Sequence, residues 1–132
     1  MGIQTRRVYE AAVGSDGVRI LVDRLWPRGV KKEALPLECW LKEVAPSNAL
    51  RKWFGHDPRK WPEFERRYAK ELETHPEAWR PLLNAAREGD VTLLYSAHDT
   101  QRNNAVALKA YLESKLRKRR VQKRVQRRQG PP

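Results

Sequence analysis

The sequence predicts an α/β fold of three layers, in which helices flank a small and mostly parallel sheet. Two runs, Val18–Asp23 and Val91–Tyr95, are short and almost wholly apolar, which is typical of strands covered on both faces. Segments with a helical spacing of apolar residues separate them. A strand, several helices and a second strand of the same sheet require a parallel crossover connection.

The first half of the chain begins with a strand-like run over Arg6–Tyr9. A Gly-Ser-Asp-Gly turn at residues 14–17 leads into the Val18–Asp23 strand. The loop after that strand contains Pro27, which restricts the backbone, and Gly29, which allows a turn.

Helices occupy the middle and the end of the chain, and each has a start signal. Ser47 is expected to cap a short helix, Asp57 followed by Pro58 is a second start, and Asp99 is expected to cap the last helix. The predicted apolar stripes are Trp61, Phe64, Tyr68 and Leu72; Trp79, Leu82, Leu83 and Ala86, in a helix from Pro76 to near Gly89; and Val106, Leu108, Tyr111, Leu112 and Leu116.

The 132 residues fit one domain, residues 1–116, followed by a basic tail, residues 117–132. The tail holds eight of the 28 Lys and Arg residues and no acid, which leaves +4 of the formal +12 charge for the domain. The domain itself is therefore only mildly basic. The tail is either a flexible, solvated extension or a segment that binds an anionic partner.

Composition also indicates where the protein works. The single cysteine, Cys39, excludes an intrachain disulfide and favours a reducing compartment. No glycine or arginine follows Cys39 as far as Ala45, so a phosphatase-type nucleophile loop is not expected. The N-terminus lacks the apolar run of a signal peptide, and no stretch approaches the ~18 apolar residues that span a membrane. We therefore expect a cytoplasmic protein without membrane contact.

Two polar segments, Asp23–Gly29 and Ser96–Asn104, follow the two apolar strands. Open α/β sheets bind ligands at the carboxyl ends of their strands, and parallel neighbours would bring both segments to one crevice. Guanidinium groups bind phosphates and carboxylates through paired hydrogen bonds, and a helix N-terminus favours an anion. The sequence therefore predicts a site for a small anionic or nucleotide-like ligand.

The residue types in these segments suggest individual roles: arginines for the anion, an indole for stacking, and carboxylates or imidazole for acid–base chemistry. The candidate ligand-binding residues are Arg24, Trp26, Arg28, Tyr95, Arg102 and Asn103, and the candidate catalytic residues are Asp23, His98 and Asp99. The alternative interpretation is that Asp23 pairs with Arg24 or Arg28 and only ties the loop down.

Metal and cofactor motifs give no positive signal. The dipeptides His56-Asp57 and His98-Asp99 offer too few metal ligands, and their spacing does not match known metal sites, so no metal site is expected. The sequence has no glycine-rich dinucleotide or phosphate loop, and it assigns no cofactor. No nucleophile and base stand at a diagnostic spacing, which leaves open whether the protein is an enzyme.

Nucleic-acid binding through the basic segment Arg117–Arg128 is the alternative function. Such binding would weaken steeply with salt, because phosphate contacts release counterions. No recognised nucleic-acid-binding motif accompanies the segment.

Three segments carry a resemblance to a known family: residues 22–29 (VDRLWPRG), residues 53–58 (WFGHDP) and residues 93–99 (LLYSAHD) with Asn103 and Ala105. They resemble the YeaO-like branch of the domain-of-unknown-function family 488, over about residues 5–116, with the tail outside the match. The resemblance implies a compact bacterial cytoplasmic α/β domain and no established reaction. A His often stands in that family where this chain has Arg102. A catalytic role of that His would be lost here, whereas anion binding would be kept.

Overall fold

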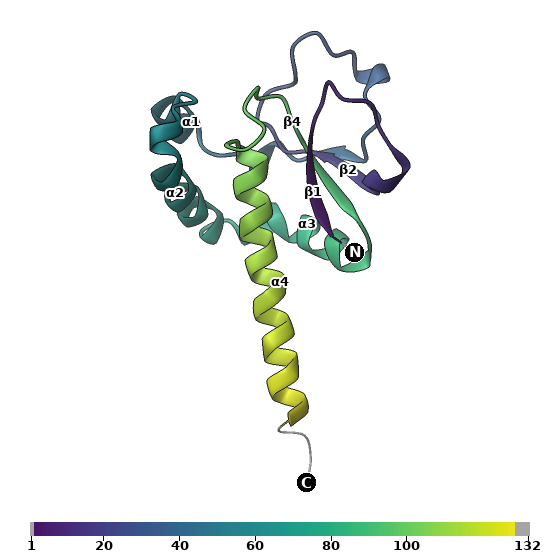
Figure 1. The fold of residues 1–132 in the computed structure, drawn as a ribbon, viewed down its shortest axis with the longest axis vertical. Helices are drawn as coiled ribbons and strands as arrows, with labels where there is room; N and C mark the ends of the chain where they lie inside the picture. The colour runs from purple at the N-terminus through teal and green to yellow at the C-terminus, as the bar shows by residue number, and fades with distance from the viewer. Residues whose placement is uncertain (1, 129–132) are drawn as a thin grey trace.

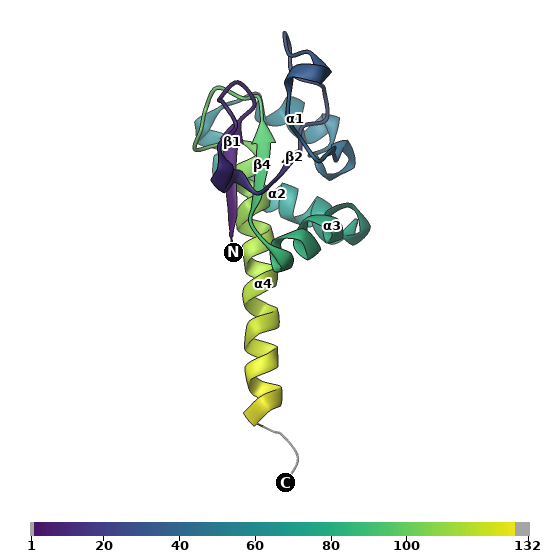
Figure 2. The same ribbon diagram turned by 90° about the vertical axis from the view of Figure 1, so that its right-hand side faces the viewer.

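A computed structural model describes the backbone of residues 2–128 and the side chains of residues 2–118. Four parallel strands form one sheet in the order β1-β4-β2-β3, and the α-helices pack beside it (Figures 1 and 2). The predicted α/β class with a parallel sheet is confirmed. The end of the predicted tail, residues 129–132, lies outside the described residues.

The centre of the sheet is β4 (Val91–Tyr95), which is buried along its whole length. It pairs with β1 (Ile3–Arg7) on one side and with β2 (Val18–Leu21) on the other. The predicted strand over Arg6–Tyr9 was wrong in its bounds. The strand begins at Ile3 because Ile3 is the residue that pairs with Val91, where the ladder with β4 starts.

A fourth strand, β3 (Cys39–Trp40), was not predicted. It extends the sheet beyond β2 by pairing Cys39 with Ile20 and Trp40 with Leu21. Two residues are too few to show an alternating pattern in the sequence. The Cys39 thiol is half-buried, and burial raises its pKa, so it is a poor nucleophile at neutral pH.

The helices are α1 (Asn48–Phe54), α2 (Trp61–Glu73), α3 (Pro76–Glu88) and α4 (Asn104–Arg128). The Ser47 hydroxyl accepts a hydrogen bond from the Leu50 N–H, which confirms the predicted cap of α1. Asp57 caps the single-turn 3-10 helix η4 (Pro58–Lys60), which runs into α2. The prediction that Asp99 caps the last helix was wrong.

The residue that caps α4 is Asn103, whose side-chain oxygen accepts from the Val106 N–H at 2.9 Å. Asp99 performs a similar task one turn earlier, because its carboxylate accepts from the N–H groups of Gln101 and Arg102. Asp and Asn both suit such positions. The sequence therefore offers two suitable caps, and the helix begins after the second.

The sheet separates two hydrophobic cores of different construction. Leu93 faces the larger core, which all four α-helices complete, while its neighbour Leu94 faces a smaller one, as expected of successive residues in a strand. Residues from the segment 26–37, including Trp26 and Leu35, cover this second face. The third layer is thus a loop with the single-turn 3-10 helix η2 (Lys32–Ala34).

A buried ionic network lies at the amino-terminal end of the sheet. Asp16, in the 3-10 helix η1 (Gly14–Asp16), is 1% exposed and pairs with Arg19 and Arg6. The next residue, Gly17, has φ 63° and lies so close to Asp90 that a Cβ would come within 2.2 Å of its carbonyl oxygen. This corner of the fold therefore requires glycine.

Candidate functional site

The two predicted polar segments do meet at the carboxyl ends of β2 and β4. The Asp23 carboxylate accepts hydrogen bonds from the backbone N–H of Ser96 at 2.9 Å, its hydroxyl at 2.8 Å and the Asn104 amide at 3.0 Å. The Asp23 carbonyl also accepts from the Trp40 indole at 2.6 Å. Asp23 thus joins β2, β3, β4 and α4. Its partners are Ser96 and Asn104 rather than Arg24 or Arg28.

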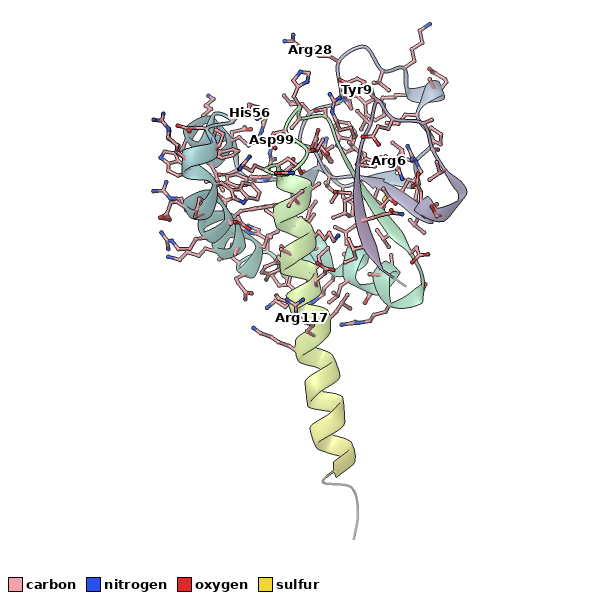
Figure 3. The ribbon with its side chains drawn as sticks, in the orientation of Figure 1. Arg6, Tyr9, Arg28, His56, Asp99 and Arg117 are labelled. Carbon is pink, nitrogen blue, oxygen red and sulfur yellow. The ribbon has the colours of Figure 1, made fainter. Side chains whose placement is uncertain are left out.

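The first of the two candidate arginines in this loop, Arg24, bonds to the chain itself. Its guanidinium donates to the carbonyls of Ala45 at 3.2 Å and Pro46 at 3.3 Å, which anchors the segment before α1. Arg28 is exposed, and its side chain extends outward from the loop (Figure 3). Its backbone carbonyl accepts from the Tyr9 hydroxyl at 3.2 Å.

Trp26, the predicted stacking surface, belongs to the smaller hydrophobic core. Its indole N–H donates to the Val30 carbonyl at 2.6 Å, and its ring meets that of Trp40 edge to face at 5.5 Å. These contacts close the loop that covers the second face of the sheet. One side of the ring faces Lys32, whose amino group lies 5.9 Å from the ring centre.

Tyr95 and Asn103 form the floor of the second segment. Both are nearly inaccessible, at 2% and 3% exposed, and burial raises the pKa of Tyr95. The Asn103 amide donates to the Asp99 carbonyl, while its oxygen caps α4. Both polar groups of the Asn103 side chain are therefore engaged in organising the start of the last helix.

Asp99, Arg102 and His98 lie at the surface of this turn. Hydrogen bonds from the N–H groups of Gln101 and Arg102 hold the pKa of Asp99 below its usual value. The Arg102 guanidinium lies 3.5 Å from the same carboxylate, and His98 is exposed. A lowered pKa makes Asp99 a weaker general base at neutral pH.

Sequence reasoning missed Arg7, which closes this edge of the sheet from β1. Its guanidinium donates to the carbonyls of Ala97 at 2.9 Å and Ser96 at 3.4 Å and stacks over the Tyr9 ring. The only available signal was its place at the end of a strand-like run. In the described part of the chain, no group of three His, Cys, Asp or Glu residues could hold a metal ion.

The second candidate region is the far half of α4, residues 117–128, here named the basic arm. Among the side chains that the structure describes, the core residues that α4 contributes, from Ala105 to Leu116, all precede it. Tyr111 and Lys115 bind Glu73 of α2 at 2.6 and 2.7 Å, and the next turn, at Arg117 and Lys118, is exposed. Figures 1 and 2 show the helix continuing past the rest of the molecule. The arm holds eight Lys and Arg residues and no acid.

The fold and these regions define a small parallel α/β domain with a basic helical extension. Within residues 2–128, no helix has the length and apolar character needed to cross a membrane. The chain belongs to the DUF488 family, since the model of the inactive DUF488-N3 subclade matches residues 2–130. The match therefore includes the basic arm, which corrects the expected range of residues 5–116.

Relatives of this chain are known by name only. It is 46% identical over 114 residues to the uncharacterized protein YeaO of Escherichia coli, which covers 86% of this chain and 99% of the relative. It is 35% identical over 113 residues to the uncharacterized protein Rv3073c of Mycobacterium tuberculosis, with 86% and 95% covered. No solved structure matches significantly.

Proposed function

We propose that this protein is a non-catalytic DNA-binding protein that holds duplex DNA with its basic arm. The observation that carries the proposal is the helix α4, which continues past the rest of the molecule and whose residues 117–128 include eight cations and no acid. Neutralising phosphates releases counterions, and this term supplies most of the affinity of sequence-independent binding.

The dimensions of the arm match duplex DNA. Residues 117–128 of a regular α-helix span about 18 Å. Duplex DNA carries one charge per ~1.7 Å of its axis, so the arm runs beside about ten phosphates. The major groove of B-form DNA admits a helix, whereas that of A-form RNA is too narrow for side chains to read. These dimensions favour DNA over duplex RNA.

The carboxyl edge of the sheet supports a catalytic or small-ligand function less well. A shared anion site there needs Arg24 or Arg28 in a common concavity with Asp99. Arg24 instead bonds to two carbonyls, and Arg28 extends from an exposed loop. Asp23 accepts three hydrogen bonds from Ser96 and Asn104. The family description "inactive" agrees with a role that requires no reaction.

The test is the salt dependence of binding to a fluorescent duplex of about 20 base pairs, followed by anisotropy from roughly 50 to 300 mM salt. We expect a slope of log affinity against log salt of about −5 to −7, because six to eight phosphates are contacted. Replacing the eight arm cations with Gln, a good helix former, should remove most of the binding. An eight-Lys arm, with its charge retained, should bind within about threefold of wild type.

The same titration is made with duplex RNA and with anionic lipid vesicles, since basic helices also bind such surfaces. A shallow salt slope, equal affinity of the Gln arm, or tighter binding to RNA or vesicles than to DNA would overturn the proposal.

A further inference from the structure

A groove between α1 and α2 is a second place where cations gather without a function assigned to them. It has a volume of about 330 Å³ and lies between the start of α1 and the exposed side of α2. The lining residues that matter here are Ser47, Trp53, Arg66, Arg67, Lys70 and Glu71.

The acids in and beside this groove already have partners within the protein. Both oxygens of Glu71 accept hydrogen bonds from Ser47, from its N–H at 2.9 Å and its hydroxyl at 2.6 Å. A hydrogen bond from Arg66 and the charges of Arg66 and Arg67 hold the pKa of Glu63 below its usual value. One carboxylate therefore serves two arginines, and Lys70 makes no ion pair among the described side chains.

Trp53 contacts two cations, of which Arg67 lines the groove and Lys60 does not. The Arg67 guanidinium lies 4.1 Å from the centre of the indole, and the Lys60 amino group lies 5.1 Å from it. Lys60 also donates to the Trp53 carbonyl at 2.8 Å. A guanidinium stacked on an aromatic ring loses less freedom when it binds a phosphate, because its plane is already fixed.

The groove lies on an element that is directly joined to the basic arm. Lys70 is one helical turn before Glu73, and Glu73 binds Tyr111 and Lys115 of α4, just ahead of Arg117. Figure 1 shows α2 beside the first half of α4, with the arm continuing beyond it. A duplex that follows the arm can therefore reach the cations of α2.

We propose that the α1–α2 groove binds a phosphate of the DNA backbone and is the second contact for the duplex held by the arm. Arg67 and Lys70 supply the charge, and Trp53 fixes the orientation of Arg67. The inference rests on the proposed function and adds the point at which the folded domain touches DNA.

The test compares two full-length variants that each lose two positive charges. In the groove variant, Arg67→Gln and Lys70→Gln are combined; in the control, Lys31→Gln and Arg80→Gln remove exposed cations that do not line the groove. With the same duplex, the groove variant should bind about three- to tenfold more weakly, and its salt slope should fall by about 2. The control should keep the wild-type slope. Thermal unfolding of each variant confirms that it is folded.

The outcomes separate the two proposals. If the wild-type chain binds DNA and the groove variant matches the control in affinity and slope, the groove proposal is wrong and the arm proposal stands. If the wild-type chain does not bind DNA at all, both proposals are wrong.

Discussion

The carboxyl edge of the sheet and the basic arm both contain arginines that could bind an anion, yet the two regions differ in composition and in their place in the fold. At the edge, Asp23, Arg24 and Asn103 direct their hydrogen bonds to the protein's own backbone and side chains. The arm lies beyond the core and carries cations without acids. A polar residue at a strand end is therefore evidence of a ligand site only when its hydrogen bonds are not already made within the fold.

The largest effect on stability should come from the buried ionic network of Asp16, Arg19 and Arg6 at the opposite end of the sheet. Like the polar residues of the carboxyl edge, these side chains bind one another within the fold. Removing one partner of a buried ion pair leaves the other uncompensated, so Asp16→Ala should cost about 3–5 kcal/mol in the free energy of unfolding. Urea denaturation measures this loss. The exposed Glu88→Ala serves as the control, with a change within about 0.5 kcal/mol.

The same network should give the protein an acid-sensitive stability. Burial on its own raises the pKa of Asp16, but hydrogen bonds from Val13 and Arg19 and the charges of Arg6 and Arg19 outweigh it, so the pKa lies below its usual value. An acid whose pKa is lower in the folded state than in the unfolded state stabilises the fold at pH values above its unfolded-state pKa. This stabilisation is lost as the pH falls through the folded-state pKa. Wild type should therefore lose part of its advantage over Asp16→Ala only below about pH 4. A difference between the two that is constant down to pH 2 would contradict this account.

A smaller effect is expected at the carboxyl edge itself. Asp23→Ala leaves the N–H and hydroxyl of Ser96 and the Asn104 amide without their acceptor, which should cost about 1–3 kcal/mol. Its affinity for duplex DNA should stay within about twofold of wild type, because the arm supplies the binding. Unchanged stability together with lost DNA binding would mean that Asp23 serves the ligand and not the fold.

These cases show what could be predicted from the sequence. The strands β2 and β4 were predictable because strands buried on both faces are continuous apolar runs, and the stripes of α2, α3 and α4 because burial of one helix face spaces apolar residues by three or four. The two-residue strand β3 has no period to detect. The partners of Arg24, the carbonyls of Ala45 and Pro46, lie far along the chain. Which carbonyls Arg24 binds depends on tertiary packing, and this cannot be predicted from the residues around Arg24 in the sequence.

Cap residues and the loop layer illustrate the same limit. Asp99 and Asn103 are equally suitable caps by residue type, and packing of the Ala105–Leu112 stripe decides that α4 starts after Asn103. Trp26 lies in a charged loop by sequence, but the loop folds over the second face of the sheet and places the indole against Trp40. The anion-site prediction depended on side-chain direction, which residue types alone do not give.

The smallest expected effect provides the most direct test of the comparison between the edge and the arm. Arg28 is exposed, and among the described residues its one hydrogen bond is made by its carbonyl, which an alanine would keep. Arg28→Ala should therefore change stability by less than about 0.5 kcal/mol. It should also leave DNA affinity within about twofold, because Arg28 belongs neither to the arm nor to the α1–α2 groove. A thermal-shift screen of wild type and variant against pyrophosphate, nucleotides and small carboxylates completes the measurement, since a ligand that binds the native state raises its unfolding temperature. An increase in the unfolding temperature of wild type that disappears in Arg28→Ala would show that the carboxyl edge binds an anion. The carboxyl edge and the basic arm would then differ in the size of the ligand that each binds, and not in whether they bind one.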